Sequence, residues 1–135
     1  MKPYEFEQLV CDHYRQKGYR VQTTSASNDY GIDVFAEKKG EKIAVQVKMY
    51  GGSTRKVNRQ TMMELYGAAA YFDCTKAVLA TDGEVLTDAK EVAHKLGIDI
   101  LFIQPDRKIS MPIWITSSAD RGIRRPKGRR PGLQN

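Results

Sequence analysis

The spacing of apolar residues along the chain predicts helices and strands in a regular succession. Over residues 4–17 the apolar side chains recur at the helical period, and Gly18 follows, where a left-handed residue often ends a helix. Residues 37–41 form an expected turn, so the strands on either side of it should pair as a hairpin. The strands expected in this half of the chain are 19–23, 32–36 and 43–49.

The second half of the chain predicts two further helices between strands. A glycine-containing break at 50–54 precedes a helix over about 57–72. Thr87 is the expected N-cap of the third helix, which Gly97 ends. The order α-β-β-β-α-β-α-β predicts an α/β fold with one central mixed sheet flanked by helices. The remaining expected strands are 76–81, 98–103 and 109–115.

Composition limits the classes of protein that this chain can belong to. With 135 residues, 41% of them hydrophobic and 28% charged, the chain fits one ordered domain with a single core. It contains no apolar run near the roughly 20 residues that span a bilayer, and its first residues lack the apolar segment of a signal peptide. We therefore expect a cytoplasmic protein with no membrane partner.

The few soft ligands limit the metals that the chain can bind. Two cysteines and two histidines, with no C-x-x-C pair, exclude a structural zinc site of four such ligands. Any bound metal is then expected to be a hard cation held by oxygen atoms.

The net charge of +6 is concentrated at the end of the chain. Residues 121–135 contain six basic residues and no acidic one, which leaves 16 basic and 16 acidic residues before them. This pattern predicts a folded domain over 1–116 and a basic tail over 117–135 whose charges suit DNA phosphates. A solubilising tail without a partner is the alternative. The expected DNA-binding residues of the tail are Arg121, Arg124, Arg125, Lys127, Arg129 and Arg130.

Polar residues interrupt two strands that are otherwise apolar. In the strand at 43–49, Gln46 and Lys48 point to the same face, roughly 7 Å apart by strand geometry. Asp33 stands between Ile32 and Val34, where a carboxylate needs a partner or a metal. Hairpin pairing would bring Asp33 beside Gln46 and Lys48. Carboxylate and carbonyl oxygens suit Mg²⁺ and an ammonium stabilises negative charge, so this group suits phosphodiester hydrolysis.

Asp33 followed by Gln46-Val47-Lys48 resembles the D…(E/Q)-x-K motif of the PD-(D/E)xK nucleases. The string Asn-Asp-Tyr-Gly-Ile-Asp-Val at 28–34 is similar to the D-x-G-I-D segment of the Mrr-like restriction endonucleases, in which Gln for Glu is a familiar variant. The resemblance covers roughly the first hundred residues. Further similar segments are Phe6-Glu7, 18–23, 64–68, 78–81 and 89–103.

The resemblance implies a restriction-endonuclease-like αβββαβ core and Mg²⁺- or Mn²⁺-dependent cleavage of DNA. By position, Asp33, Gln46 and Glu7 would be catalytic metal ligands and Lys48 the catalytic lysine. Gln60 would contact DNA near the scissile phosphate. Asp29 is a weaker candidate with a structural role.

Each of these assignments has a plainer alternative. Glu7 can be an exposed helix residue, Lys48 an edge-strand lysine that blocks aggregation, and Gln46 one member of a polar patch. We also expect a homodimer, because two sites related by a two-fold axis can cut two antiparallel strands. Its expected surface is Ala68-Ala69-Ala70 followed by Tyr71 and Phe72.

Two other functions compete with restriction. Holliday-junction-resolving endonucleases share the expected fold and small size, although they usually carry Glu-x-Lys where this chain has Gln46-Val47-Lys48. A DNA-binding module with a degenerate nuclease site is the non-enzymatic alternative, because Gln46 removes one formal negative charge from the metal ligands.

Overall fold

The computed structural model describes residues 1–24, 30–104 and 106–111. Its elements are α1 Pro3–Gln16, β1 Arg20–Thr23, β2 Val34–Lys38, β3 Glu41–Lys48, α2 Arg59–Tyr71, β4 Lys76–Thr81, α3 Thr87–Leu96, β5 Asp99–Ile103 and β6 Ile109–Ser110. Within this part of the chain, no helix has both the length and the apolar character needed to cross a membrane.

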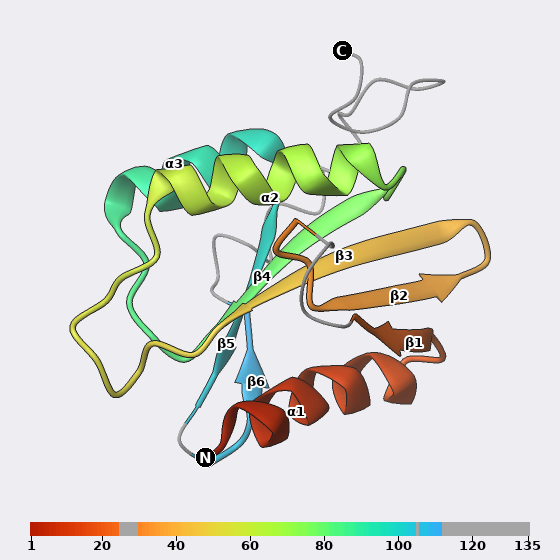
Figure 1. Ribbon diagram of the computed structural model, residues 1–135, viewed down its shortest axis with the longest axis horizontal. Helices are drawn as coiled ribbons and strands as arrows, with labels where there is room; N and C mark the ends of the chain where they lie inside the picture. The colour runs from red at the N-terminus through yellow and green to blue at the C-terminus, as the bar shows by residue number, and fades with distance from the viewer. Residues whose placement is uncertain (25–29, 105, 112–135) are drawn as a thin grey trace.

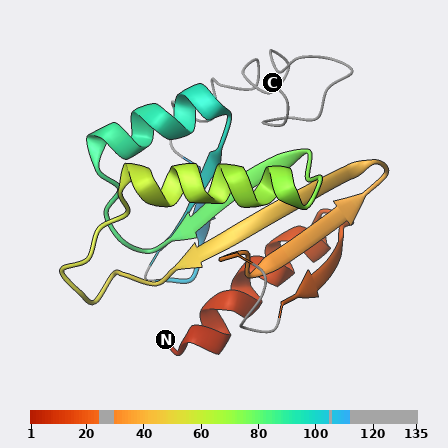
Figure 2. The same ribbon diagram turned by 45° about the horizontal axis from the view of Figure 1, so that its top comes forward.

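The strands form one six-stranded mixed sheet in the order β1-β2-β3-β4-β5-β6. β2 runs antiparallel to both of its neighbours, β1 and β3; β3, β4 and β5 run parallel, and β6 returns antiparallel to β5. Figure 1 and Figure 2 show α2 and α3 on one face of the sheet and α1 on the other. The prediction of an α/β fold with a mixed sheet flanked by helices is confirmed.

Two apolar clusters lie on opposite faces of the sheet because successive residues of a strand point in opposite directions. Ala44 and Leu79 face the cluster under α2 and α3. Val45 and Val78 face the cluster under α1. The predicted alternation of faces along β3 is therefore observed, and it determines on which side of the sheet each polar residue of β3 lies.

The hairpin of β2 and β3 differs from the prediction in its turn. We expected strands at 32–36 and 43–49 with a turn over 37–41, but the strands extend to Lys38 and from Glu41. The turn consists of Lys39 and Gly40, with φ values of 46° and 83°. Positive φ at both central residues is typical of the tightest hairpin turns, whose twist matches that of the strands, so the ladder continues into the expected turn.

The start of α3 also differs from the prediction. The N-cap is Leu86, and Thr87 is the first helical residue and not the cap. Leu86 is half-buried and its backbone N–H donates to the Val57 carbonyl at 3.0 Å. Packing and this bond, which sequence alone does not show, fix where the chain enters the helix. The predicted end is confirmed, because Gly97 has a φ of 73°.

The end of the domain falls partly outside the described residues. The strand expected at 109–115 is present as Ile109–Ser110. Residues 112–115 and the expected boundary between 116 and 117 lie outside the part that the structure describes.

Two neighbouring methionines of α2 allow a matched test of the core. Met62 is fully buried, whereas Met63 is 56% exposed. We predict that Met62→Ala lowers the free energy of unfolding by about 2–5 kcal/mol, because it leaves a cavity under α2. Met63→Ala should change it by less than about 0.5 kcal/mol. Urea unfolding monitored by circular dichroism measures both, and equal effects would contradict this packing.

Candidate functional site

The start of β2 lies beside the end of β3, and Asp33 directly precedes β2 at this point (Figure 1). The Asp33 backbone N–H donates to the Val45 carbonyl at 2.8 Å. The Asp33 carboxylate oxygen Oδ2 accepts a hydrogen bond from the Val47 backbone N–H at 2.7 Å. The carboxylate therefore lies against the backbone of β3 between Gln46 and Lys48, where hairpin pairing predicted it.

Gln46 is a polar residue buried on the face of β3 that α2 and α3 cover, with 7% of its surface exposed. Its carbonyl oxygen Oε1 is buried and has no hydrogen-bond partner among the described residues. Burying an unpaired polar atom costs about 1–3 kcal/mol, so this oxygen is suited to receive a donor or a cation.

Gly31 is the close neighbour that covers the other end of the Gln46 side chain. It adopts a φ of +87°, and a Cβ at this position would lie 2.7 Å from Gln46 Nε2. A side chain at residue 31 would therefore be strained and would displace the amide. The lack of a side chain at Gly31, within the 28–34 segment, lets the Gln46 amide occupy its buried position.

Glu7 reaches the same region from α1, on the opposite face of the sheet. Its side chain is half-buried, and burial together with the nearby Asp33 carboxylate raises the pKa of Glu7. The two carboxylates are thus close enough to repel each other. No group of three or more Cys, His, Asp or Glu residues able to hold a metal occurs in the described ranges, so the candidate oxygen ligands are these two carboxylates and the Gln46 amide.

Lys48 ends β3 and projects into a second part of the site. Its ammonium lies 5.8 Å from the centroid of the Tyr50 ring. Lys48 and Gln60 line the same pocket, of about 390 Å³, in which Gln60 Nε2 donates to Glu64 Oε2 at 3.0 Å. The structure therefore places Gln60 and Lys48 at the same pocket.

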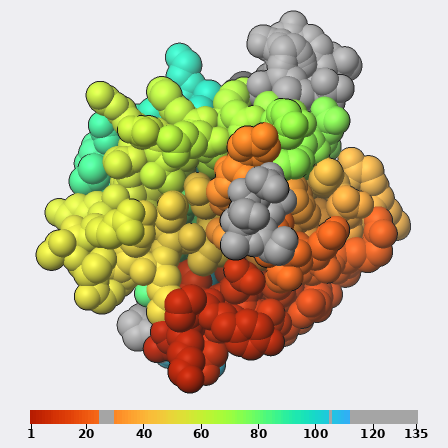
Figure 3. All heavy atoms as spheres, viewed as in Figure 1, coloured from red at the N-terminus to blue at the C-terminus, as the bar shows by residue number. Residues whose placement is uncertain are grey.

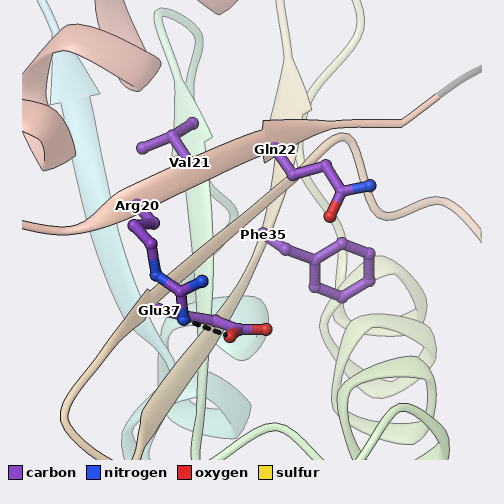
Figure 4. A pocket seen from close by; sticks show the side chains of 5 residues that line it. All are labelled: Arg20, Val21, Gln22, Phe35 and Glu37. Atoms are coloured by element: carbon purple, nitrogen blue, oxygen red, sulfur yellow. Dashed lines mark hydrogen bonds and ion pairs between the residues drawn. The ribbon is translucent and has the colours of Figure 1, made fainter.

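A second hollow, of about 320 Å³, lies at the edge of the sheet on β1 and β2 (Figure 4). The guanidinium of Arg20 and the carboxylate of Glu37 cross it as an ion pair of 3.2 Å. These charges satisfy each other, and none of the predicted site residues lines the hollow. It is therefore separate from the site at Asp33.

Two of the five residues expected to form a dimer surface are buried in the protein's own core. Ala68 and Ala69 are each 6% exposed and lie on the buried face of α2, so their prediction as surface residues was wrong. Phe72 is half-buried, with its ring centroid 5.3 Å from that of Phe35. Tyr71 remains 67% exposed beside Tyr30, at the rim of an apolar hollow of about 440 Å³.

Several predicted residues lie outside the described part of the chain. They are Asp29 in the segment 25–29 and the basic residues of the tail, Arg121, Arg124, Arg125, Lys127, Arg129 and Arg130.

Sequence reasoning placed residues 49–52 in a loop beside the site, but it missed Arg55, which shapes the pocket beside Lys48. Tyr50 and Arg55 line it, and the Arg55 guanidinium carbon lies 4.5 Å from the centroid of the Tyr50 ring. The available clue was an arginine within a loop that begins directly after the strand carrying Gln46 and Lys48. Its contact with an aromatic ring five residues earlier depends on the loop conformation.

Comparison with known proteins relates this chain to one family. The restriction endonuclease family model Mrr_cat matches residues 1–108. An uncharacterized protein of Sinorhizobium fredii, y4cE, is 34% identical over 111 residues, covering 74% of this chain and 27% of that protein. A UPF0102 protein of Aquifex aeolicus is 39% identical over 49 residues, covering 36% of this chain and 48% of its own length. The chain thus spans about a quarter and about half of these relatives.

Two solved structures are also similar to this one. The crystal structure of AF1548, a protein of unknown function, has a TM-score of 0.58 at 20% identity and covers 70% of this chain and 56% of that one. A structure of the MspJI restriction endonuclease in complex with a 27-mer oligonucleotide has a TM-score of 0.49 at 14% identity, covering 70% and 23% of the two chains. The likeness to AF1548 shows a shared fold.

The proximity of Asp33 and the burial of Glu7 predict how Glu7 titrates in metal-free protein. Glu7 should titrate above the ordinary range of a glutamate, because burial and the negative charge of Asp33 both disfavour its ionised form. Asp33→Asn should lower the pKa of Glu7, but not to the ordinary value, because burial is the larger cause. Carboxyl-carbon NMR with a chelator present measures both values. An unchanged Glu7 pKa in Asp33→Asn would show that the two groups are not neighbours.

Proposed function

Because this chain belongs to the Mrr_cat restriction endonuclease family, we propose that it is a metal-dependent endonuclease that hydrolyses DNA phosphodiester bonds at Asp33, Gln46 and Lys48. The buried, unpartnered Gln46 Oε1 beside the anchored Asp33 carboxylate carries this proposal. A polar patch with a purely structural role would be expected to satisfy that oxygen internally.

The residues present fit a divalent cation. Glu7, Asp33 and Gln46 would hold it, since carboxylate and amide oxygens suit Mg²⁺ or Mn²⁺. Burial is the larger cause of the raised pKa of Glu7, and a cation here would offset the second cause, the charge of Asp33. When bound, it would supply Lewis-acid polarisation of a phosphate oxygen and a more acidic water.

Lys48 supplies the positive charge that the reaction itself needs. It has no ion pair with any described residue, so its ammonium is available to a phosphate. Negative charge grows on the phosphoryl oxygens as water attacks, and an ammonium fixed at the end of β3 stabilises that charge without rearranging. The Val47 N–H holds the Asp33 carboxylate in place through a 2.7 Å hydrogen bond. Gln60, in the same pocket as Lys48, would contact the DNA strand there.

We predict cleavage of duplex DNA with Mg²⁺ or Mn²⁺ and none with a chelator. Lys48→Ala should reduce the cleavage rate at least about 100-fold, with DNA binding and folding preserved, because its charge acts mainly in the transition state. Lys48→Arg should also lose cleavage, because a planar guanidinium does not replace the compact charge of an ammonium. Gel assays with linear duplex and with a four-way junction measure the cleavage rate. The matched control is Lys95→Ala, which removes an exposed lysine of α3.

Three outcomes would change the assignment. Wild-type rates in Lys48→Ala would remove Lys48 from the mechanism. Preference for the four-way junction would favour the resolving enzymes over restriction. DNA binding without cleavage under every metal condition, and without metal binding in calorimetry, would favour a module with a degenerate site.

The basic tail is proposed to supply affinity for DNA that does not depend on sequence. Deleting residues 121–135 removes six positive charges. If about five of them contact phosphates, the slope of log K against log salt should fall by roughly four to five units. Cleavage at low salt should persist, because no proposed catalytic residue lies in the tail. Fluorescence anisotropy across a salt series measures the slope, and an unchanged slope would assign the tail to solubility or another partner.

A further inference from the structure

The loop between β3 and α2 builds a polar pocket next to Lys48. In Figure 3 this loop, drawn in yellow, projects at one side of the molecule. The pocket has a volume of about 390 Å³ and opens beside the proposed catalytic lysine. Its lining residues are Lys48, Tyr50, Arg55, Lys56, Asn58, Gln60, Thr61 and Glu64.

Positive charge is in excess in this pocket. Three of its lining residues are cations, and Glu64 is the one carboxylate in the lining. Lys56 lies 3.6 Å from the carboxylate of Glu84, which compensates part of its charge. Arg55, like Lys48, forms no ion pair within the described ranges. Glu64 also forms no ion pair there, so one guanidinium and one ammonium stand against one carboxylate, and the net positive charge suits an anion.

The Tyr50 ring holds the Arg55 guanidinium in position. The guanidinium carbon lies 4.5 Å from the ring centroid, close enough for a cation–π interaction. The same ring lies 5.8 Å from the Lys48 ammonium. One aromatic side chain thus contacts both of these cations, which sets them at the same pocket.

The loop that carries Tyr50 is itself fixed. The Gly51 N–H donates to the Asp82 carboxylate at 2.8 Å, and the backbone N–H and hydroxyl of Ser53 both donate to the Tyr50 carbonyl at 2.9 Å. The chain approaches Asp82 so closely that a Cβ at Gly51 would lie 2.7 Å from its carboxylate oxygen. The aromatic support is therefore formed before any ligand arrives, which reduces the entropy lost on binding.

We propose that Arg55, held by Tyr50, binds a DNA backbone phosphate next to the scissile phosphate, whose transition-state charge Lys48 stabilises. This inference rests on the proposed function, because it takes DNA as the ligand. A guanidinium presents a rigid fork of donors that matches two phosphate oxygens, and stacking on an aromatic ring leaves that fork exposed. Contact with the backbone gives affinity and alignment but carries no direct sequence information.

Binding of a fluorescein-labelled 20-base-pair duplex in chelator tests the proposal without cleavage. Arg55→Ala should raise Kd about tenfold and lower the slope of log K against log salt by about one, because one phosphate contact is lost. Arg55→Lys should lose less, since it keeps the charge. Tyr50→Leu should raise Kd about two- to fivefold by releasing the guanidinium, whereas Tyr50→Phe, which keeps the ring, should match wild type. Lys95→Ala, a lysine outside the pocket, is the charge control.

The result separates this inference from the proposed function. A Kd and salt slope in Arg55→Ala equal to those of wild type overturn the phosphate site, even if the wild-type protein cuts DNA. Equal losses in Arg55→Ala and Lys95→Ala also overturn it, because they indicate net charge alone. A selective loss in Arg55→Ala supports the site even if no metal condition yields cleavage, and in that case the nuclease proposal fails alone. Circular dichroism melts confirm that each variant is folded.

Discussion

β2 and β3 are joined by two residues, and the register that this turn imposes positions the whole candidate site. Pairing runs from Lys38 with Glu41 to Val34 with Val45, so that Asp33 meets the backbone beyond Val45. A slip of one residue would reverse the faces of β3 and move apolar side chains out of both clusters. The two cores thus resist any slip, and through the register they keep the carboxylate beside Gln46 and Lys48.

The same arrangement places a polar amide on a face that is otherwise apolar. Gln46 belongs to the side of β3 that packs under α2 and α3, yet its carbonyl oxygen has no partner among the described residues. A fold selected for stability alone would be expected to carry an apolar residue there. A buried polar residue that lowers stability, in a sheet stable enough to tolerate it, is typical of a position retained for a function.

Much of this organisation follows from the sequence because it depends on local periodicity. Strand parity alone put Gln46 and Lys48 on one face, and pairing across a short turn put Asp33 beside them. The features that were missed depend on contacts between distant segments. Leu86 is the cap of α3, where its backbone bonds to Val57, and Ala68 and Ala69 are buried because they lie on the face of α2 that packs on the core. The stacking of Arg55 on Tyr50 likewise depends on a loop conformation set by a remote aspartate.

The two edges of the sheet have a consequence for how copies of this molecule meet. Among the described residues the edge strands are β1, with four residues, whose Arg20 pairs with Glu37 of β2, and β6, with two residues. A strand from another chain pairs with a sheet edge through a long row of unpaired backbone N–H and C=O groups. Short edge strands that carry charged side chains present few such groups. The edges formed by the described strands are therefore poorly suited to strand addition and to growth into fibrils. The long strand β3, whose central residues are apolar, is kept away from other chains by its neighbours β2 and β4.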